Sequence, residues 1–320
     1  MDRKALLIGI ENYKSKKFPN LSGVIKETER LEEILSKDHD GKYNYHCDTL
    51  LNDRETVRRS QLRNKLIKFF NDKNYDECLL YFSGHGSVKG GVGFLCTSEA
   101  TLDDPGISFF ELQSLAMNSH HDEVIIILDC CFSGEMFQIS SQGEDRTSLR
   151  KGMAILAAAS SEQSAEMSAG GSIFTKHLID GLKGQAGDVV GKVTLGSLYR
   201  HLEQLLSLAD QRPQFAAYLE RESVIRKCKP ALEAEVIREL KPLFQGKLDN
   251  FPLEPAYEPE AKLGDTEKER QFRLLQKFAK VGFVVPVGEE HMYDAAMNSK
   301  SCKLTPLGHY YRQLVLKKQI

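Results

Sequence analysis

Long hydrophobic runs are missing from this 320-residue sequence, and so is a strong excess of charge of either sign. The first apolar stretch, residues 5–10, is too short for the core of a signal peptide or for a membrane span. The formal net charge of −2 gives the whole chain no electrostatic bias toward nucleic acids or membranes. We therefore expect a protein without a membrane anchor.

Cysteine is sparse and follows no pairing pattern. The seven cysteines are an odd number, only Cys130 and Cys131 are adjacent, and no Cys-x-x-Cys spacing occurs. Disulfide frameworks need an even set of cysteines, and structural zinc sites usually contain closely spaced ones. The sequence therefore predicts neither, we expect no metal and no cofactor, and a cytoplasmic location fits best.

What the chain does contain is an alternation of apolar runs and amphipathic segments. The runs at residues 5–10, 78–82 and 124–128 are bounded by turn residues, as fully buried strands of a parallel sheet are. Strands that alternate with helices form right-handed βαβ units, so we predict an α/β domain with a parallel sheet. Further strands are predicted at residues 45–51, 153–159 and 214–219, and helices at residues 21–35, 55–70, 109–117, 173–182 and 195–206.

The length suits about two domains, and the composition changes after Pro230. Residues 239–266 contain four of the ten prolines among mixed charges, which is typical of a linker. We therefore predict a sheet domain over residues 1–230, a Pro-rich linker over residues 231–265 and a small domain over residues 266–320.

The small C-terminal domain is expected to be α+β. Its pattern predicts a helix at residues 267–281, hairpin arms at residues 283–287 and 293–297, and a last helix from residue 304 to 316 that is capped by Thr305 and has Pro306 in its first turn. This order looks like part of a winged-helix module, which can bind DNA or dock a partner. Ten basic and five acidic residues are dispersed along it without an Arg-rich recognition helix. We therefore favour an activating partner or a small-molecule signal over DNA.

Two chemically reactive side chains follow two of the predicted strands. His85 comes just after the run at residues 78–82, and Cys131 comes just after the run at residues 124–128. Because the carboxyl ends of parallel strands meet at one edge of a sheet, a Cys-His pair can form there. A thiolate is a nucleophile, and an adjacent imidazole can protonate a leaving amine. The alternative is that both thiols are ordinary core cysteines.

The glycines beside the histidine fit the catalytic interpretation. Gly84 and Gly86 flank His85, so the backbone can approach closely without a Cβ clash. The backbone N–H groups of Gly86 and Cys131 could form an oxyanion hole, and each such donor contributes about 3–4 kcal/mol in hydrolases.

The two motifs together resemble those of the caspase-like cysteine peptidases, and are most similar to the branch of metacaspases and bacterial caspase homologues. The motifs are Tyr81-Phe82-Ser83-Gly84-His85-Gly86 and Asp129-Cys130-Cys131-Phe132-Ser133-Gly134. The resemblance covers residues 1–225 and implies a three-layer sandwich with a mostly parallel central sheet. It also implies a cysteine endopeptidase in which Cys131 is the nucleophile and Cys130 is its packed neighbour.

The resemblance further implies a substrate pocket for basic side chains. Asp129 stands where metacaspases carry a pocket acid, and Glu27 replaces the shorter Asp expected in the first helix. Ser83 matches a family residue near that pocket, and Ala158 and Ser160 lie in a matching strand segment. A pair of desolvated carboxylates favours a cation, so we expect cleavage of proteins or peptides after Arg or Lys. The alternative makes Asp129 a strand-end cap and Glu27 a solvated helix charge.

Other features of the family are weaker in this sequence. Glu99 and the pair Asp103-Asp104 lie where metacaspases gather acids for calcium, but they fit a surface turn better, so no metal is assigned. The polar loop at residues 135–151 contains Arg146, Arg150 and Lys151, where self-cleavage is chemically feasible. The rival hypotheses are a catalytically silent scaffold and a DNA-binding regulator. The resemblance also suggests a role in bacterial stress or antiviral defence.

Overall fold

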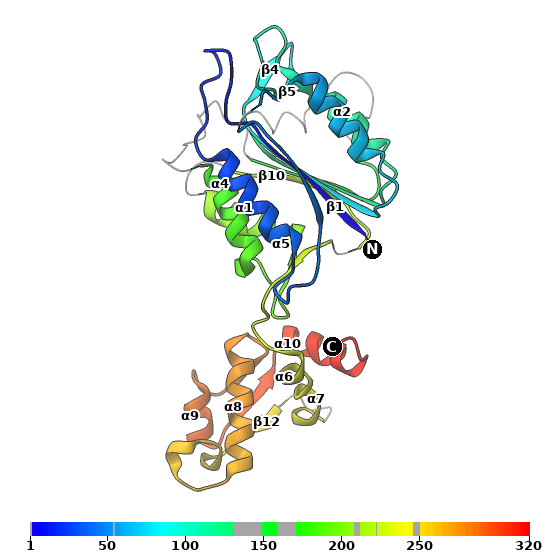
Figure 1. The fold of residues 1–320 in the computed structure, drawn as a ribbon. Coiled ribbons are helices and arrows are strands. Elements are labelled where there is room, and N and C mark those ends of the chain that lie inside the picture. Colours follow the sequence, from blue (N-terminus) through cyan, green and yellow to red (C-terminus); the bar gives the residue numbers. More distant parts are fainter. Residues whose placement is uncertain are drawn as a thin grey trace. The chain divides into compact units, whose positions relative to one another are not determined.

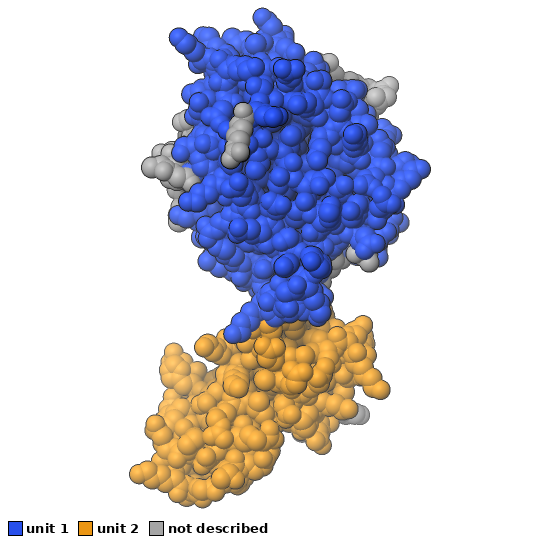
Figure 2. Space-filling view, in the orientation of Figure 1, with its two compact units in different colours: residues 1–187, 192–229 blue, residues 188–191, 230–320 orange. Residues whose placement is uncertain are grey.

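The fold is described from a computed structural model of the chain. It covers residues 2–53, 55–130, 149–158, 171–207, 212–221, 223–245 and 250–320. These residues form two compact units, which are coloured separately in Figure 2. The first unit contains residues 1–187 and 192–229, and the second contains residues 188–191 and 230–320.

A six-stranded sheet forms the centre of the first unit, with the strand order β10-β8-β7-β3-β1-β2. Five strands run parallel to their neighbours, and only the edge strand β10 is antiparallel. The central strands β3 and β7 are buried along their whole length, as their continuous apolar sequences predict. The strands are β1 (Arg3–Gly9), β2 (His46–Leu51), β3 (Glu77–Ser83), β7 (Glu123–Asp129), β8 (Met153–Ala157) and β10 (Gln214–Tyr218).

Helices cover both faces of this sheet (Figure 1). On one face, α1, α4 and α5 bury side chains against alternate strand residues such as Leu79 and Tyr81. On the other face, α2 and α3 pack against the intervening residues, such as Leu80 and Phe82. The period-two alternation along each strand therefore supplies two separate cores and gives the predicted three-layer sandwich. The helices are α1 (Val24–Ser36), α2 (Arg59–Phe70), α3 (Phe109–Met117), α4 (Ile173–Asp180) and α5 (Leu195–Leu206).

Several small elements in the first unit were not predicted. The segment after β3 is a three-stranded antiparallel sheet of β4 (Gly86–Lys89), β5 (Val92–Cys96) and β6 (Gly106–Ser108), and its first strand starts one residue after His85. A two-stranded ladder joins β9 (Lys192–Thr194) to β11 (Val224–Lys227). A π-helical turn, η2 (Gly181–Gln185), follows α4 directly.

Residues 231–265 belong to the second unit and do not form a separate linker. They contain α6 (Ala234–Arg238), α7 (Leu240–Leu243), β12 (Asn250–Pro252), η4 (Pro255–Tyr257) and η5 (Pro259–Ala261). Ile237, Leu240 and Phe244 are buried in the same core as Phe272 and Phe278 of helix α8 (Thr266–Lys280). The prolines therefore lie inside a folded unit: Pro242 is within α7, Pro252 ends β12, and η4 and η5 begin at Pro255 and Pro259. The apolar residues between them have a core to enter.

The predicted C-terminal hairpin is also arranged differently. The first arm is confirmed as β13 (Val284–Val287), but residues 293–297 lie in a helix, α9 (Met292–Met297). The second arm is β14 (Ser301–Leu304), which pairs with both β13 and β12. The last helix, α10 (Pro306–Leu316), is capped as predicted, because the Thr305 hydroxyl accepts a hydrogen bond from the N–H of Gly308.

The short helix α9 lies between β13 and β14, and α10 follows β14. The winged-helix assignment stays a prediction. No helix within the described ranges is both long and apolar enough to cross a membrane.

Candidate active site

The described residues of the two sequence motifs meet at the carboxyl edge of the sheet. In the parallel pair β3 and β7, Ser83 lies opposite Asp129, the last residue of its strand. The ladder continues beyond the strands, because Gly84 donates its N–H to the carbonyl oxygen of Asp129 at 3.3 Å. His85 lies two residues after Ser83, at the same edge of the sheet. The sequence predicts this position, because His85 follows the end of a buried parallel strand.

Two of the predicted site residues, Cys131 and Ser160, lie outside the described residues. Cys130 is described: it is 6% exposed and packs in the core between the sheet and α2 and α3. Ala158 follows β8 and donates its N–H to the carbonyl oxygen of Leu128 at 2.8 Å. These two contacts hold the end of β7 in place up to the residue before Cys131.

The imidazole of His85 is held by a loop between β1 and α1. Its Nε2 lies 2.7 Å from the carbonyl oxygen of Pro19. Because that oxygen can only accept, Nε2 carries the proton of the neutral ring, and Nδ1 is left as the basic nitrogen. Burial lowers the pKa of His85, and the hydrogen bond to Pro19 opposes that effect. The neutral imidazole is therefore the favoured form at neutral pH.

Tyr13 fixes the backbone and one face of the same histidine. Its hydroxyl accepts a hydrogen bond from the backbone N–H of His85 at 2.7 Å. The two rings are arranged edge to face, with their centroids 4.7 Å apart. A Cβ at Gly84 would lie 2.7 Å from this hydroxyl oxygen, so the glycine leaves the space that Tyr13 occupies. Sequence analysis missed Tyr13 and Pro19. Gly84 was the available signal, since a glycine beside a functional residue indicates a close approach.

The loop that carries Tyr13 is held by Asn52, which is 3% exposed. The Asn52 side chain accepts from the backbone of Glu11 at 2.7 Å and of Asn12 at 3.3 Å, and donates to the Asn12 carbonyl oxygen at 2.5 Å and to Ser98 at 3.0 Å. One amide thus ties the loop to the end of β2 and to the segment after β5.

The two predicted pocket acids are brought together beside α4. Glu27 projects from the first turn of α1 and accepts the backbone N–H of Ser172 at 3.0 Å. A Cβ at Gly171 would lie 2.2 Å from the Glu27 carboxylate, so only glycine leaves room for this contact. Burial raises the pKa of Glu27 to about 7, and the nearby charge of Asp129 adds to this effect.

Asp129 is 7% exposed and is surrounded by hydroxyl groups. Thr175 of α4 donates to its Oδ2 at 2.5 Å, and Ser83 donates to the same oxygen at 3.5 Å. Burial raises the pKa of Asp129, and these hydrogen bonds partly offset the shift. Glu27, Ser83 and Asp129 therefore belong to one cluster. Gly86, the predicted oxyanion-hole residue, is not part of that cluster and begins β4 opposite Leu95.

A family model described as a caspase domain matches residues 2–224. The chain belongs to the caspase family. That family consists of cysteine peptidases, and its domain corresponds to the first unit with its mostly parallel sheet. The search of curated proteins finds no match.

Solved structures resemble the caspase domain at low sequence identity. A protein from Geobacter sulfurreducens is 15% identical with a TM-score of 0.51, and the alignment covers 72% of this chain and 98% of that one. Caspase-1 from Spodoptera frugiperda is 12% identical with a TM-score of 0.49, covering 71% of this chain and 90% of that one. At 15% identity, the similarity to the Geobacter sulfurreducens protein shows a shared fold and does not show a shared function.

The acids considered for calcium are engaged in other contacts. Glu99 accepts the N–H of Arg59 at 3.1 Å, and Asp104 pairs with the Arg59 guanidinium at 3.2 Å. Asp103 lies 3.8 Å from the ammonium group of Lys89. Among the residues that the structure describes, no group of three or more His, Cys, Asp or Glu side chains could hold a metal ion.

The basic residues of the loop at 135–151 differ in their surroundings. The Arg150 guanidinium donates to the carbonyl oxygens of Ala116, His121 and Lys151 at 3.3, 2.7 and 3.0 Å. Lys151 pairs with Glu220 at 2.8 Å on the surface. Arg146 lies outside the described residues. Arg150 would have to break three hydrogen bonds before it could enter a substrate pocket.

Proposed function

We propose that the chain is a cysteine endopeptidase that uses a Cys131–His85 dyad and cleaves proteins or peptides after Arg or Lys. The observation that carries this proposal is the strand register in which Ser83 lies opposite Asp129. His85 and Cys131 each follow this aligned pair by two residues. Two residues of chain span at most about 7 Å, so both side chains start from the same edge of the sheet.

The proposed chemistry follows acyl transfer. The Cys131 thiolate attacks the carbonyl carbon of the scissile peptide bond, and the N–H of Gly86 stabilises the oxyanion. His85 accepts the thiol proton at its basic nitrogen and returns it to the leaving amine. Water then attacks the thioester, with the neutral imidazole as general base. The hydrogen bond from Nε2 to Pro19 supports this role, since it keeps Nδ1 free of the ring proton.

The preference for basic side chains is supported by the two acids. Glu27 and Asp129 come from different elements; burial raises the pKa of both carboxyl groups, and repulsion from the charge of Asp129 raises the pKa of Glu27 further. A guanidinium or ammonium group between them would relieve that repulsion, whereas an acidic substrate side chain would add to it. Electrostatics therefore favours Arg or Lys over Asp.

The second unit is proposed to regulate the peptidase in response to a partner or a small signal. It is a compact unit with its own hydrophobic core, which supports a function separate from catalysis. A role in stress or antiviral defence and a cytoplasmic location stay predictions.

A panel of fluorogenic peptides that differ only in the residue before the scissile bond tests the proposal. Purified full-length protein should turn over Arg and Lys peptides and leave Asp peptides intact, and His85→Ala should abolish turnover. Turnover of Asp peptides without Arg peptides would contradict the proposed specificity. Equal turnover by the His85→Ala variant would contradict the dyad.

A further inference from the structure

We propose that Thr175 is a positioning residue for substrate specificity: its hydroxyl, backed by that of Tyr81, orients the buried Asp129 carboxylate toward a basic substrate side chain. This inference rests on the proposed function, because it gives Asp129 the role of recognising Arg or Lys. Neither Thr175 nor Tyr81 belongs to the dyad or was singled out by the sequence pattern of the pocket.

Three side chains form a directed chain of hydrogen bonds. The Thr175 hydroxyl oxygen lies 2.5 Å from Oδ2 of Asp129 and 2.5 Å from the hydroxyl of Tyr81. A carboxylate can only accept, so Thr175 must donate its single proton to Asp129. Thr175 therefore accepts from Tyr81, and the order is Tyr81 to Thr175 to Asp129. Each bond in such a chain polarises the next one and strengthens it.

The three hydrogen-bonded side chains are deeply buried, so the loss of one of these hydrogen bonds costs free energy. Thr175 and Tyr81 have no exposed surface, and Asp129 has 7%. A buried carboxylate is costly unless charge or hydrogen bonds compensate for its lost hydration. The groups that favour the ionised form of Asp129 are the hydroxyls of Thr175, Ser172 and Ser83, with Thr175 contributing most. Thr175 thus helps to keep the carboxylate charged and fixes the position of its Oδ2.

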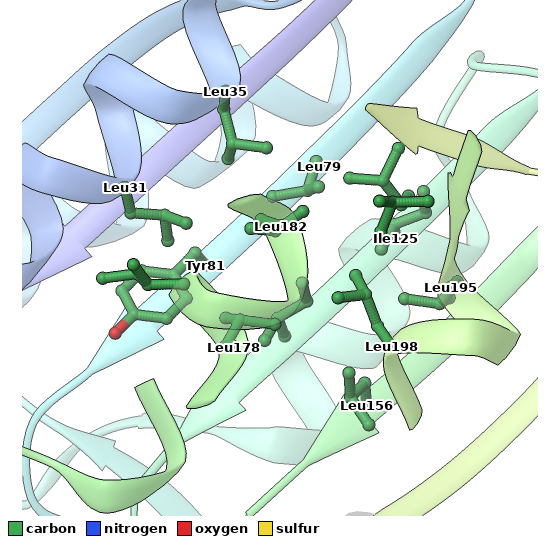
Figure 3. Packing of buried hydrophobic residues seen from close by; sticks show 14 of the residues in the cluster. Leu31, Leu35, Leu79, Tyr81, Ile125, Leu156, Leu178, Leu182, Leu195 and Leu198 are labelled. Atoms are coloured by element: carbon green, nitrogen blue, oxygen red, sulfur yellow. The ribbon is translucent and has the colours of Figure 1, made fainter. Parts of the chain in front are cut away.

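The first turn of α4 serves both pocket acids. Its N-cap residue Ser172 donates its backbone N–H to Glu27, and the Ser172 hydroxyl accepts the N–H of Thr175 at 3.4 Å. One helical turn therefore sets the relative position of Glu27 and Asp129. Figure 3 shows the Tyr81 ring among the leucines of the core, with its hydroxyl oxygen at the margin of the cluster. That packing makes the Tyr81 hydroxyl a fixed donor.

The test replaces the hydroxyl without changing the shape of the side chain. Thr175→Val should raise KM for an Arg peptide by about tenfold to a hundredfold, the range for a hydrogen bond to a charged group, with kcat changed much less. It should also move the acid limb of the kcat/KM profile to higher pH, since the pKa of Asp129 rises further when its main donor is removed. Thr175→Ser should restore both quantities, and Tyr81→Phe should shift them in the same direction by a smaller amount.

A matched control separates positioning from helix stability. Thr194 caps α5 in the same way that Ser172 caps α4, so Thr194→Val lowers stability without touching the pocket acids. Thermal unfolding of each variant shows whether it folds, and Tyr81→Phe keeps the test decisive if Thr175→Val does not fold.

Each outcome supports or overturns a defined claim. An unchanged KM and an unchanged acid limb in folded Thr175→Val or Tyr81→Phe, with wild type active on Arg peptides, would overturn this inference alone. A fall in kcat without a rise in KM would also overturn it. Wild type that turns over Asp peptides and ignores Arg peptides would overturn the proposed function, and the role of Thr175 with it.

Discussion

At the end of β3, the position of His85 depends on a residue that has no side chain. Gly84 leaves open the volume that the Tyr13 hydroxyl fills, and that hydroxyl in turn accepts the backbone N–H of His85. The histidine is thus held at its backbone by Tyr13 and at its ring by Pro19. A glycine is therefore needed before the histidine because a side chain there would clash with Tyr13, and not because the backbone must be flexible.

A double-mutant cycle measures this dependence. Gly84→Ala should lower kcat by about a hundredfold, because the new methyl displaces Tyr13 and misplaces the imidazole. Tyr13→Phe should cost less, since the ring contact to His85 remains. The double variant should lose less than the sum of the two effects, because removing the hydroxyl removes part of the clash. Strictly additive losses in the free energy of activation would show that Gly84 and Tyr13 act independently.

The acid pair predicts a pH dependence of substrate binding. The pKa of Glu27 is raised from 4.5 to about 7, mainly by burial. A cationic substrate binds the ionised carboxylate more strongly, so KM for an Arg peptide should fall as pH rises from 6 to 8. Glu27→Gln should raise KM at pH 8 and flatten this dependence. A KM that stays constant over this range in wild type would contradict a role for Glu27 in binding.

The same shift has a consequence for stability with the opposite sign. The folded protein binds the Glu27 proton more tightly than the unfolded chain does, so between pH 4.5 and about 7 this group makes the free energy of unfolding fall as pH rises. Glu27→Gln should therefore be more stable than wild type at pH 8, as thermal unfolding at pH 5 and pH 8 can measure. Binding and folding thus place opposing demands on this residue.

The strands and helices of the sheet domain follow from local pattern, whereas the smaller elements do not. The runs in β3 and β7 are buried on both faces, so their sequences are continuously apolar and easily found. The short strands of the β4–β5–β6 sheet are partly exposed and lack that signal. In α9, Met292, Ala295 and Ala296 have the helical spacing, but the helix is so short that a strand fitted the sequence equally well.

The loop between β1 and α1 is the element that depends most on a single side chain. Asn52→Ala removes four hydrogen bonds, one of them fully buried, and should lower the free energy of unfolding by about 2 kcal/mol. It should also lower kcat, because Tyr13 and Pro19 lie in that loop. Asn74→Ala is the control: the exposed Asn74 side chain donates a hydrogen bond to the half-buried Asp72, and its removal should change stability by less than about 0.5 kcal/mol. Equal kcat in the two variants would show that the loop does not position His85.

At the scale of the whole molecule, the chain is divided differently from what its prolines indicate. The hydrophobic core of the second unit contains Leu232, Ile237, Leu240 and Phe244, which are spaced three to five residues apart. The four prolines obscured this pattern in the sequence. The segment 188–191 also belongs to the second unit, although it lies between η2 and β9 in the sequence. Such a long-range association cannot be predicted from local periodicity. Likewise, the sequence suggested the pocket roles of Glu27 and Asp129 only through the family resemblance, and it did not suggest Thr175.

The second unit is expected to modulate the peptidase. Deleting residues 230–320 should change kcat/KM for an Arg peptide, or its response to an activator, by about fivefold or more, the lower range of allosteric coupling. The deletion also exposes Val189 and Val190, which pack against the hydrophobic core of the second unit. The deletion is therefore combined with Val189→Ser and Val190→Ser. Full-length protein with these two substitutions is the control. Unchanged kinetics in the truncated protein would reject the regulatory role.

The assignment of the nucleophile is the central claim, and it is tested most directly by comparing Cys131→Ala with Cys130→Ala. Cys130 is 6% exposed and packs in the core between the sheet and α2 and α3, so its thiol is shielded from a substrate. Turnover of an Arg peptide by the two folded variants should therefore separate them cleanly. Cys131→Ala should abolish turnover, and Cys130→Ala should keep most of it. Loss of turnover in Cys130→Ala, with activity retained in Cys131→Ala, would contradict the account.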